Sequence, residues 1–211
     1  MLGADGVANL LVERIQSVVP QRLAQIRLRY QVGTDVLPDP EQVLPFEPQQ
    51  ISVEKWPTLF VEVHDTLGKT GTTQQSSGAE IDLFSYRYRC RLYAWCRAND
   101  ALVDGGAVEQ QVRRMLLAIR ESLLIKKVLI DDETYGQTAR VDPNTVKETY
   151  GQPGTDKAGL IISGAYVEVE ILTYESLEAW PPPSDLPTTV AAPLIQAVGL
   201  GDTLPIPPTA P

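Results

Sequence analysis

The longest regular pattern in the chain is an alternation of apolar and polar side chains from Ile81 to Arg97. Its even-numbered positions, from Phe84 to Cys96, are apolar or aromatic. The odd-numbered positions after Ser85 are Arg87, Arg89, Arg91, Tyr93, Trp95 and Arg97. Alternation of this length is typical of a β-strand with one buried and one solvated face. The pattern therefore predicts a long strand whose even-numbered face lies on the core.

A helical pattern follows this strand, after a polar turn at residues 99–106. Apolar side chains then recur at the spacing of one helix face, at Val108, Val112, Met115, Leu116, Ile119 and Leu123. Laying this apolar stripe on the even-numbered face of the strand buries both surfaces. We therefore expect an amphipathic helix packed on that face.

The part of the chain before the central strand predicts a helix, a linker, a strand and a loop. Asp5 can cap a first helix, and Pro20 either kinks this helix or lies in the first turn of a second one. Residues 32–50 contain four prolines and no usable periodicity, which indicates a surface linker. Residues 58–66 alternate again and predict a strand. The polar residues 67–79 predict a flexible loop that becomes ordered on a partner.

The segment after the central helix carries turn chemistry at Asp142-Pro143-Asn144. The pentapeptide Glu-Thr-Tyr-Gly-Gln occurs on both sides of that turn, at residues 133–137 and 148–152. We expect a protruding β-hairpin over residues 131–159 that brings the two copies near each other. Residues 160–174 alternate and predict the last strand of the sheet.

Together these elements predict an α+β fold. We expect a mostly antiparallel sheet of about four to five strands, with the N-terminal helix and the central amphipathic helix packed on one face. A hydrophobic content of 43% supports a sizeable core within residues 1–180. Nine of the last 31 residues are proline. Residues 181–211 are therefore interpreted as an extended Pro-rich C-terminal arm that is ordered only against a neighbouring chain.

The charge of −9 is unevenly distributed along the chain. Nine basic and five acidic residues lie between Ile81 and Lys127, so this stretch carries +4 and the rest carries −13. An acidic chain argues against general coating of nucleic acid. Cys90 and Cys96 lie six residues apart on one strand, about 20 Å and too far for a disulfide. We expect two buried thiols, a cytosol-like compartment and no membrane span.

Candidate chemistry is sparse. Gly68-Lys69-Thr70-Gly71 lacks the earlier glycine and the following helix of a phosphate-binding loop. His64 is the only histidine and is interpreted as a strand residue beside Glu62. Asp131-Asp132-Glu133 lacks the Gly-centred loop of a cation site and indicates a solvated acidic run. The sequence therefore predicts no catalytic, cofactor-binding or metal-binding residues and no enzyme.

The arginine row at positions 87, 89 and 91 admits two interpretations. The row could face DNA phosphates. Alternatively it forms a cross-strand charge ladder with Glu62, Glu168 and Glu170, within the chain or between subunits, and we favour this ladder. Large aromatic side chains on the same face indicate an interface. The candidate intersubunit residues are Arg87, Arg89, Arg91, Tyr93, Trp95, Glu168, Glu170, Tyr135, Tyr150 and Trp180.

The order of elements and four sequence stretches resemble the tail terminator and neck proteins of tailed bacteriophages. These stretches are Trp56-Pro-Thr-Leu-Phe-Val-Glu-Val63, Tyr88-Arg-Cys-Arg-Leu-Tyr-Ala-Trp95, Val112-Arg-Arg-Met-Leu-Leu-Ala-Ile119 and Ala165-Tyr-Val-Glu-Val-Glu-Ile171. The resemblance covers about residues 5–177 and includes no catalytic motif. The long segment at residues 31–50 and the Pro-rich arm depart from the compact pattern of that family.

The resemblance implies a virion structural protein, assembled in the bacterial host cytoplasm. It implies a hexameric ring at the neck that ends the tail tube and joins it to the head connector. The implied partners are further copies of the chain, the tail tube protein and the head-proximal connector or stopper, with passive contact to DNA in the channel. A portal-bound adaptor or stopper-associated ring is one alternative, and a stand-alone binding module is another.

Overall fold

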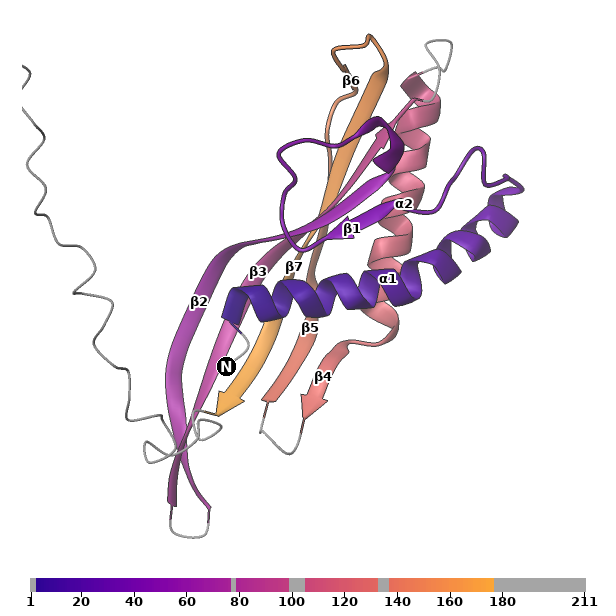
Figure 1. Cartoon of the computed structure of the whole chain (residues 1–211). Helices are drawn as coiled ribbons and strands as arrows, with labels where there is room; N and C mark the ends of the chain where they lie inside the picture. Colours follow the sequence, from indigo (N-terminus) through magenta and orange to yellow (C-terminus); the bar gives the residue numbers. More distant parts are fainter. Residues whose placement is uncertain (1–2, 77–78, 99–104, 133–136, 177–211) are drawn as a thin grey trace, which may run out of the picture. The chain divides into compact units, whose positions relative to one another are not determined.

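The computed structural model describes residues 3–76, 79–98, 105–132 and 137–176, all within the unit Met1–Ala179. The predicted arm at residues 181–211 lies outside this part. The elements in chain order are α1 (Gly3–Tyr30), β1 (Gln42–Leu44), the short 3-10 helix η1 (Val53–Lys55), β2 (Thr58–Ser76), β3 (Ala79–Arg97), α2 (Gly105–Ile125), β4 (Val128–Asp132), β5 (Gln137–Tyr150), β6 (Gly154–Thr155) and β7 (Ile161–Ser176) (Figure 1).

The strands form one mixed sheet in the order β1-β2-β3-β7-β5-β4, and β6 pairs with β7. β1 runs parallel to β2, and every other pair of neighbouring strands in the described chain is antiparallel. The predicted α+β class is confirmed, but the sheet has seven strands rather than four to five and is not wholly antiparallel. The expectation was wrong because β1 and β6 have only three and two residues, too few to show a period.

The inner face of the sheet carries the core. Cys90, Leu92, Ala94 and Cys96 on β3 are fully buried, as the alternation predicted. Buried side chains of α1, α2, β2 and β7 join them in one cluster. α1 and α2 pack against each other, and α1 crosses α2 in Figure 1. The predicted apolar stripe of α2 is buried throughout, which fixes this helix on the even-numbered face of β3.

α1 is a single helix of 28 residues that includes Pro20. Of the two interpretations of this proline, a new helix beginning there is therefore wrong. Pro20 lies on the exposed side of α1, while its neighbour Val19 is fully buried. The buried side of the helix consists of Val7, Ala8, Leu11, Val12, Ile15, Val19, Leu23 and Ile26.

The segment at residues 32–50, predicted as a surface linker, is attached to α1 by hydrogen bonds and an ion pair. The guanidinium Nε of Arg27 donates a hydrogen bond to the carbonyl of the fully buried Leu37 at 2.7 Å. Another Arg27 nitrogen forms an ion pair with Asp39 at 2.6 Å. The segment also contributes β1 to the sheet edge.

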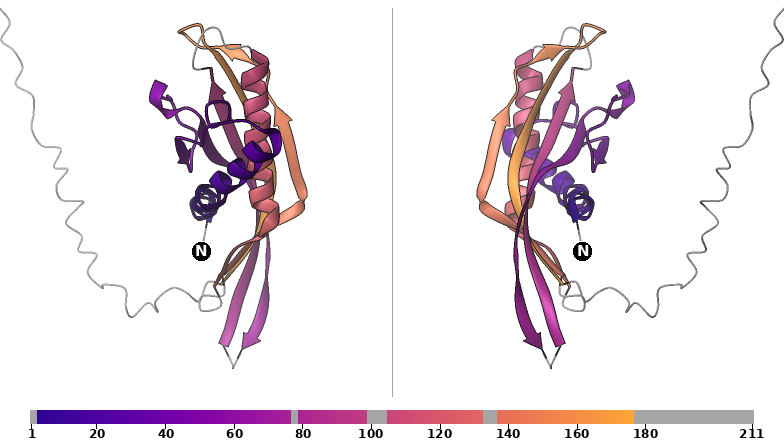
Figure 2. Two further views of the ribbon diagram at one scale, coloured as in Figure 1. Left: turned by 90° about the vertical axis from the view of Figure 1, so that its right-hand side faces the viewer. Right: turned by 90° about the vertical axis from the view of Figure 1, so that its left-hand side faces the viewer.

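The prediction of a flexible loop at residues 67–79 is wrong. β2 and β3 stay paired up to Ser76 and Ala79, so residues on both sides of positions 77–78 belong to strands. The last rung that β3 shares with β7 joins Leu83 to Ser176. The pairs from Thr73–Asp82 to Ser76–Ala79 therefore form a two-stranded ribbon beyond the rest of the sheet, as Figures 1 and 2 show.

The prediction of a β-hairpin over residues 131–159 is also wrong. β5 is one strand of 14 residues that runs through the expected turn and pairs with β7 on both sides of it. The turn chemistry instead makes a bulge between Asp142 and Lys147. The carboxylate of Asp142 accepts the backbone N–H of Asn144 at 3.0 Å, and the Thr145 hydroxyl accepts the N–H of Glu170 at 2.9 Å. Of the two pentapeptide copies, residues 133–136 lie outside the described residues, and residues 148–150 of the second copy pair with β7.

Candidate functional site

The outer face of the sheet, opposite the helices, carries the arginine row. Side chains alternate along a strand, so the odd-numbered residues of β3 point away from the buried even-numbered ones. The two strands that flank β3, β2 and β7, contribute acids to this face. We call the resulting cross-strand set the ladder; its members are Glu62, Asp65, Arg87, Arg89, Arg91, Glu168 and Glu170.

Ion pairs connect the ladder across the strands. Glu170 lies between two arginines, 3.1 Å from a nitrogen of Arg87 and 3.4 Å from a nitrogen of Arg89. Arg89 also lies 3.7 Å from Asp65 on the other side. The Nε of Arg91 donates to Glu168 at 3.0 Å. The ladder within the chain is thus confirmed for Glu168 and Glu170, and Asp65 adds a carboxylate that was not predicted. Among the described residues Glu62 forms no ion pair with the arginine row and instead accepts a hydrogen bond from Tyr93. Contact with another subunit or with DNA stays a prediction.

The charges of the ladder nearly cancel. Its three arginines face four carboxylates, and opposite charges side by side stabilise a sheet modestly. The hydrogen bond to Glu168 raises the pKa of Arg91, although partial burial opposes it. A row of paired arginines has little free charge for phosphates, because the neighbouring carboxylates would repel the same DNA. This geometry favours the ladder interpretation over a DNA surface.

An aromatic cluster continues the outer face beyond the ladder. The Phe60 and Tyr93 rings stack with centroids 4.6 Å apart, and the Phe60 and Trp95 rings meet edge to face at 5.7 Å. The Trp56 and Trp95 rings stack at 6.4 Å, and Tyr93 lies 5.1 Å from Tyr166. Such ring pairs add stability beyond simple burial.

Two contacts tie the aromatic cluster to the ladder. The guanidinium of Arg91 lies over the Tyr166 ring at 5.1 Å from its centroid. The Tyr93 hydroxyl donates to the Glu62 carboxylate at 3.1 Å. Burial raises the pKa of Tyr93, and the Glu62 charge adds to this effect. The hydroxyl therefore stays protonated and fixes one rim of the cluster.

A pocket of about 360 Å³ opens beside the aromatic cluster, and we call it the aromatic groove. Two glycines make room for it. A Cβ on Gly164 would lie 2.8 Å from Cδ1 and Nε1 of Trp95, and a Cβ on Gly151 would lie 2.7 Å from the Gly164 carbonyl oxygen. The lining residues are Trp56, Tyr93, Trp95, Thr149, Tyr150, Gly151, Gln152, Gly154, Ile162, Ser163, Gly164, Ala165 and Tyr166.

The loop beside the groove is fixed by Asp156. Its carboxylate accepts the Nε of Arg97 at 2.6 Å and the backbone N–H groups of Ala158 and Leu160 at 2.8 and 2.9 Å. Desolvation works to raise the pKa of Asp156, but the hydrogen bonds from Leu160, Arg97 and Ala158 together lower it. The charged carboxylate thus anchors this loop to the end of β3.

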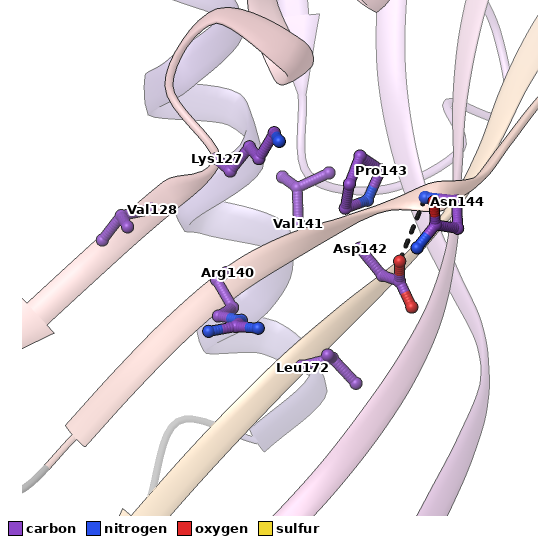
Figure 3. A pocket seen from close by; sticks show the side chains of 8 residues that line it. All are labelled: Lys127, Val128, Arg140, Val141, Asp142, Pro143, Asn144 and Leu172. Atoms are coloured by element: carbon purple, nitrogen blue, oxygen red, sulfur yellow. Dashed lines mark hydrogen bonds between the residues drawn. The ribbon is translucent and has the colours of Figure 1, made fainter.

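A second pocket, of about 490 Å³, lies at the bulge of β5 (Figure 3). Figure 3 shows Arg140 and Asp142 on β5, with Leu172 of β7 on one side of that strand and Lys127 and Val128 on the other, where the Lys127 carbonyl accepts the N–H of Val141 at 2.7 Å. The Asp142 carboxylate is already engaged with the Asn144 N–H. Basic and acidic side chains are mixed along its walls, so this pocket offers no single ligand chemistry.

The candidate interface residues do not all lie together. The three ladder arginines, their two glutamates on β7, Tyr93 and Trp95 share the outer face. Tyr150 lines the aromatic groove together with Tyr93 and Trp95, but it pairs with the buried Ala165 and its ring lies near α2, where the Arg113 guanidinium is 5.7 Å from the ring centroid. Burial and the hydrogen bond to Glu148 raise the pKa of Tyr150 to about 12. Tyr135 and Trp180 lie outside the described residues.

Three aromatic residues of the site were not among the candidates. Phe60 lies two residues from Glu62 on β2, and Tyr166 lies two residues from Glu168 on β7. The alternation along each strand could therefore have placed Phe60 and Tyr166 on the outer face. Trp56 precedes β2, and no strand register could have placed its ring against Trp95.

The remaining candidates for chemistry occupy unremarkable positions. Cys90 and Cys96 are free and fully buried, and burial raises the pKa of Cys90 to about 12 and that of Cys96 further. His64 is exposed on β2. Within the described ranges, no group of three or more His, Cys, Asp or Glu side chains could hold a metal ion. No helix in that part of the chain has the length and apolarity needed to cross a membrane.

Comparison with known proteins adds no assignment. A scan against protein-family models found no matching family, and a search of curated proteins found no match.

Proposed function

We propose that this chain is a structural protein of a tailed bacteriophage virion. In this proposal it forms a hexameric ring at the neck, ends the tail tube and joins it to the head connector. Assembly takes place in the cytoplasm of the bacterial host. The chain acts as a structural subunit and not as an enzyme.

The observation that carries the proposal is the open edge of β2. β1 pairs with β2 only from Thr58 to Phe60, so among the described residues positions 61–76 have no strand on that side. Natural proteins usually shorten, charge or cover a sheet edge, because unpaired N–H and C=O groups invite pairing with another chain. This edge continues into the β2–β3 ribbon, and isolated two-stranded ribbons are marginally stable in water. A neighbouring subunit would supply the missing support.

A ring uses such a surface naturally. Heterologous contacts join an edge on one copy to a different surface on the next, and they close when the rotation fits. The outer face supplies a second surface, with a nearly neutral ladder and half-buried aromatic rings. Tyr and Trp are enriched in protein interfaces.

The first test is the mass of the purified full-length chain by native mass spectrometry. A hexamer has six times 23.2 kDa, about 139 kDa. A monomer at every concentration would overturn the ring. A discrete mass near twice the hexamer would favour the portal-bound adaptor instead.

A matched pair of substitutions tests whether the open edge makes the contact. Leu67 on β2 and Val36 before β1 are both 46% exposed. Leu67→Lys places a charge on the open edge and should raise the concentration for half-assembly about tenfold, which corresponds to about 1.4 kcal/mol. Val36→Lys should leave it unchanged. Equal effects of both substitutions would contradict an interface along β2.

The aromatic groove favours a second candidate from another class, a stand-alone binding module. Pockets with aromatic walls and few polar groups are usual for ligand sites. A chain that stays monomeric and binds a small molecule in the groove would support this alternative.

A further inference from the structure

The aromatic groove is one part of a longer depression. A pocket of about 370 Å³ adjoins it, and the two share Trp56, Trp95 and Ile162. The stacked indoles of Trp56 and Trp95 therefore lie between two hollows. Such a surface fits an extended chain segment better than a compact ligand.

The groove also offers hydrogen-bond donors. Within the part of the chain that the structure describes, the indole N–H groups of Trp56 and Trp95 and the hydroxyl of Tyr166 donate no hydrogen bond to a protein acceptor. Polyproline II segments have no internal hydrogen bonds, so their carbonyl oxygens are free to accept. Aromatic-lined grooves that bind PxxP segments use this combination of ring faces and donors.

The chain itself contains a segment of that kind. Residues 205–208 read Pro-Ile-Pro-Pro, a PxxP sequence, and Leu204 precedes them. The whole arm at residues 181–211 contains nine prolines, two aspartates and no basic residue. Its PxxP segment carries no charged side chain, so it can bind in an apolar groove without needing an ion pair with the ladder.

The length of the arm permits docking on a neighbour. Ser176, where the described chain ends, lies ten residues along β7 from Tyr166, about 34 Å from the groove. At about 3.1 Å per residue, the 29 residues from Ser176 to Pro205 span up to about 90 Å. Strand β3, with 19 residues, is itself only about 60 Å long, so the groove of an adjacent copy is within reach.

The proline run at residues 181–183 has a shorter reach than the PxxP segment. It begins five residues after Ser176 and reaches at most about 25 Å, which is short of the groove of its own chain. The PxxP segment at the far end is therefore the better match for a groove at a distance.

We propose that residues 205–208 of one copy bind in the aromatic groove of the next copy. This inference rests on the proposed ring for the presence of a neighbour. Each copy would then give one arm and receive one, which locks a heterologous ring.

Photo-crosslinking of the full-length protein tests the docking. Benzoylphenylalanine is placed at Gln152, an exposed residue of the groove wall, and in a control protein at Val128 on β4. The protein is assembled from a mixture of light and heavy isotopic copies, irradiated and digested. We expect crosslinks from position 152 to the peptide containing residues 204–208, with light and heavy partners mixed, and none from position 128.

A variant pair sharpens the result. Pro205→Ser with Pro208→Ser disrupts the PxxP segment without touching the folded unit and should lower the crosslink yield about tenfold. Pro181→Ser with Pro182→Ser is the matched control and should leave the yield unchanged. Equal yields in the two variants would overturn the assignment of the segment.

The outcomes separate this inference from the ring itself. Crosslinks between partners of one isotope only would mean that the arm binds its own chain, which overturns docking on a neighbour. A ring of the expected mass without crosslinks to residues 204–208 would overturn the docking and leave the proposed function standing. Absence of both ring and crosslinks would overturn both.

Discussion

The two faces of β3 are made of opposite kinds of side chain. On the inner face Cys90 and Leu92 are fully buried beneath the helices. On the outer face Arg89 and Arg91 keep contact with solvent while paired to carboxylates of neighbouring strands. The two faces of this strand therefore have different roles. The inner face supplies the burial that stabilises the fold. The outer face contributes little to the core and is free to meet a partner.

A leucine on each face gives the largest expected contrast. Leu92→Ala on the inner face should lower the free energy of unfolding by about 2–5 kcal/mol, because it removes buried methyl groups and leaves a cavity. Leu67→Ala on the outer face, where the side chain is 46% exposed, should change it by about 0.5 kcal/mol or less. Urea denaturation measures both values. Similar losses would contradict the division between the faces.

A glycine pair tests the packing of the outer face next. Gly164→Ala would bring a Cβ to 2.8 Å from the Trp95 indole and should destabilise the protein by about 1–3 kcal/mol. Gly154→Ala is the control, since a Cβ there meets nothing within 4 Å. Tryptophan fluorescence should shift only in the first variant. An unchanged spectrum would show that the indole does not rest on Gly164.

The sequence predicted the inner face well because burial leaves a period in the chain. The alternation of β3 and the helical stripe of α2 each continue long enough to identify the element and its buried side. The same reasoning failed at residues 67–79, where the sequence has too few apolar residues to show an alternation, although the segment pairs with β3 as a strand up to Ser76. It failed again at Asp142-Pro143-Asn144, where turn chemistry made a bulge within one strand.

The ladder was predictable and the groove was not. Glu62, Glu168 and Glu170 lie on strands whose parity is visible, so their side of the sheet could be inferred. Asp65 has the parity of the inner face and joins the ladder only because of the register shift after Val63. The groove depends on Gly164 and Gly151, which act through the side chain they lack. It also needs the register of three strands and the position of Trp56 outside any of them. No pattern within one segment contains that information.

Two glutamates compare an ion pair on the sheet with one on a helix. Glu168→Gln breaks the pair with Arg91 in the partly buried ladder and should cost about 0.5–1 kcal/mol. Glu109→Gln breaks a pair with Arg113 four residues along the surface of α2 and should cost about 0.3–0.5 kcal/mol. Thermal unfolding at low and high salt measures both. A larger loss at Glu109 would contradict a structural role for the ladder.

The smallest effect is expected from Asp156, at the end of the outer face, and it depends on pH. Its hydrogen-bonded carboxylate has a pKa below the ordinary value of 3.8. A group whose pKa is lowered by folding stabilises the folded state above its unfolded pKa, and this contribution is lost as the pH falls through the folded pKa. Asp156→Asn keeps an acceptor for the two backbone N–H groups and removes the charge. The stability advantage of the natural chain over this variant should therefore be full at neutral pH, begin to decrease near pH 3.8 and be lost as the pH falls through the lower pKa of the folded state.

Arg97 supplies the control for that measurement. Arg97→Gln removes the cation that faces Asp156, so the pH-dependent part of the difference between Asp and Asn at position 156 should shrink in this background. Urea midpoints at several pH values give the four stabilities of the double-mutant cycle. If the stability difference between Asp and Asn at position 156 is the same at every pH, the Asp156 charge does not anchor the loop. The backbone hydrogen bonds alone would then hold the loop beside the groove.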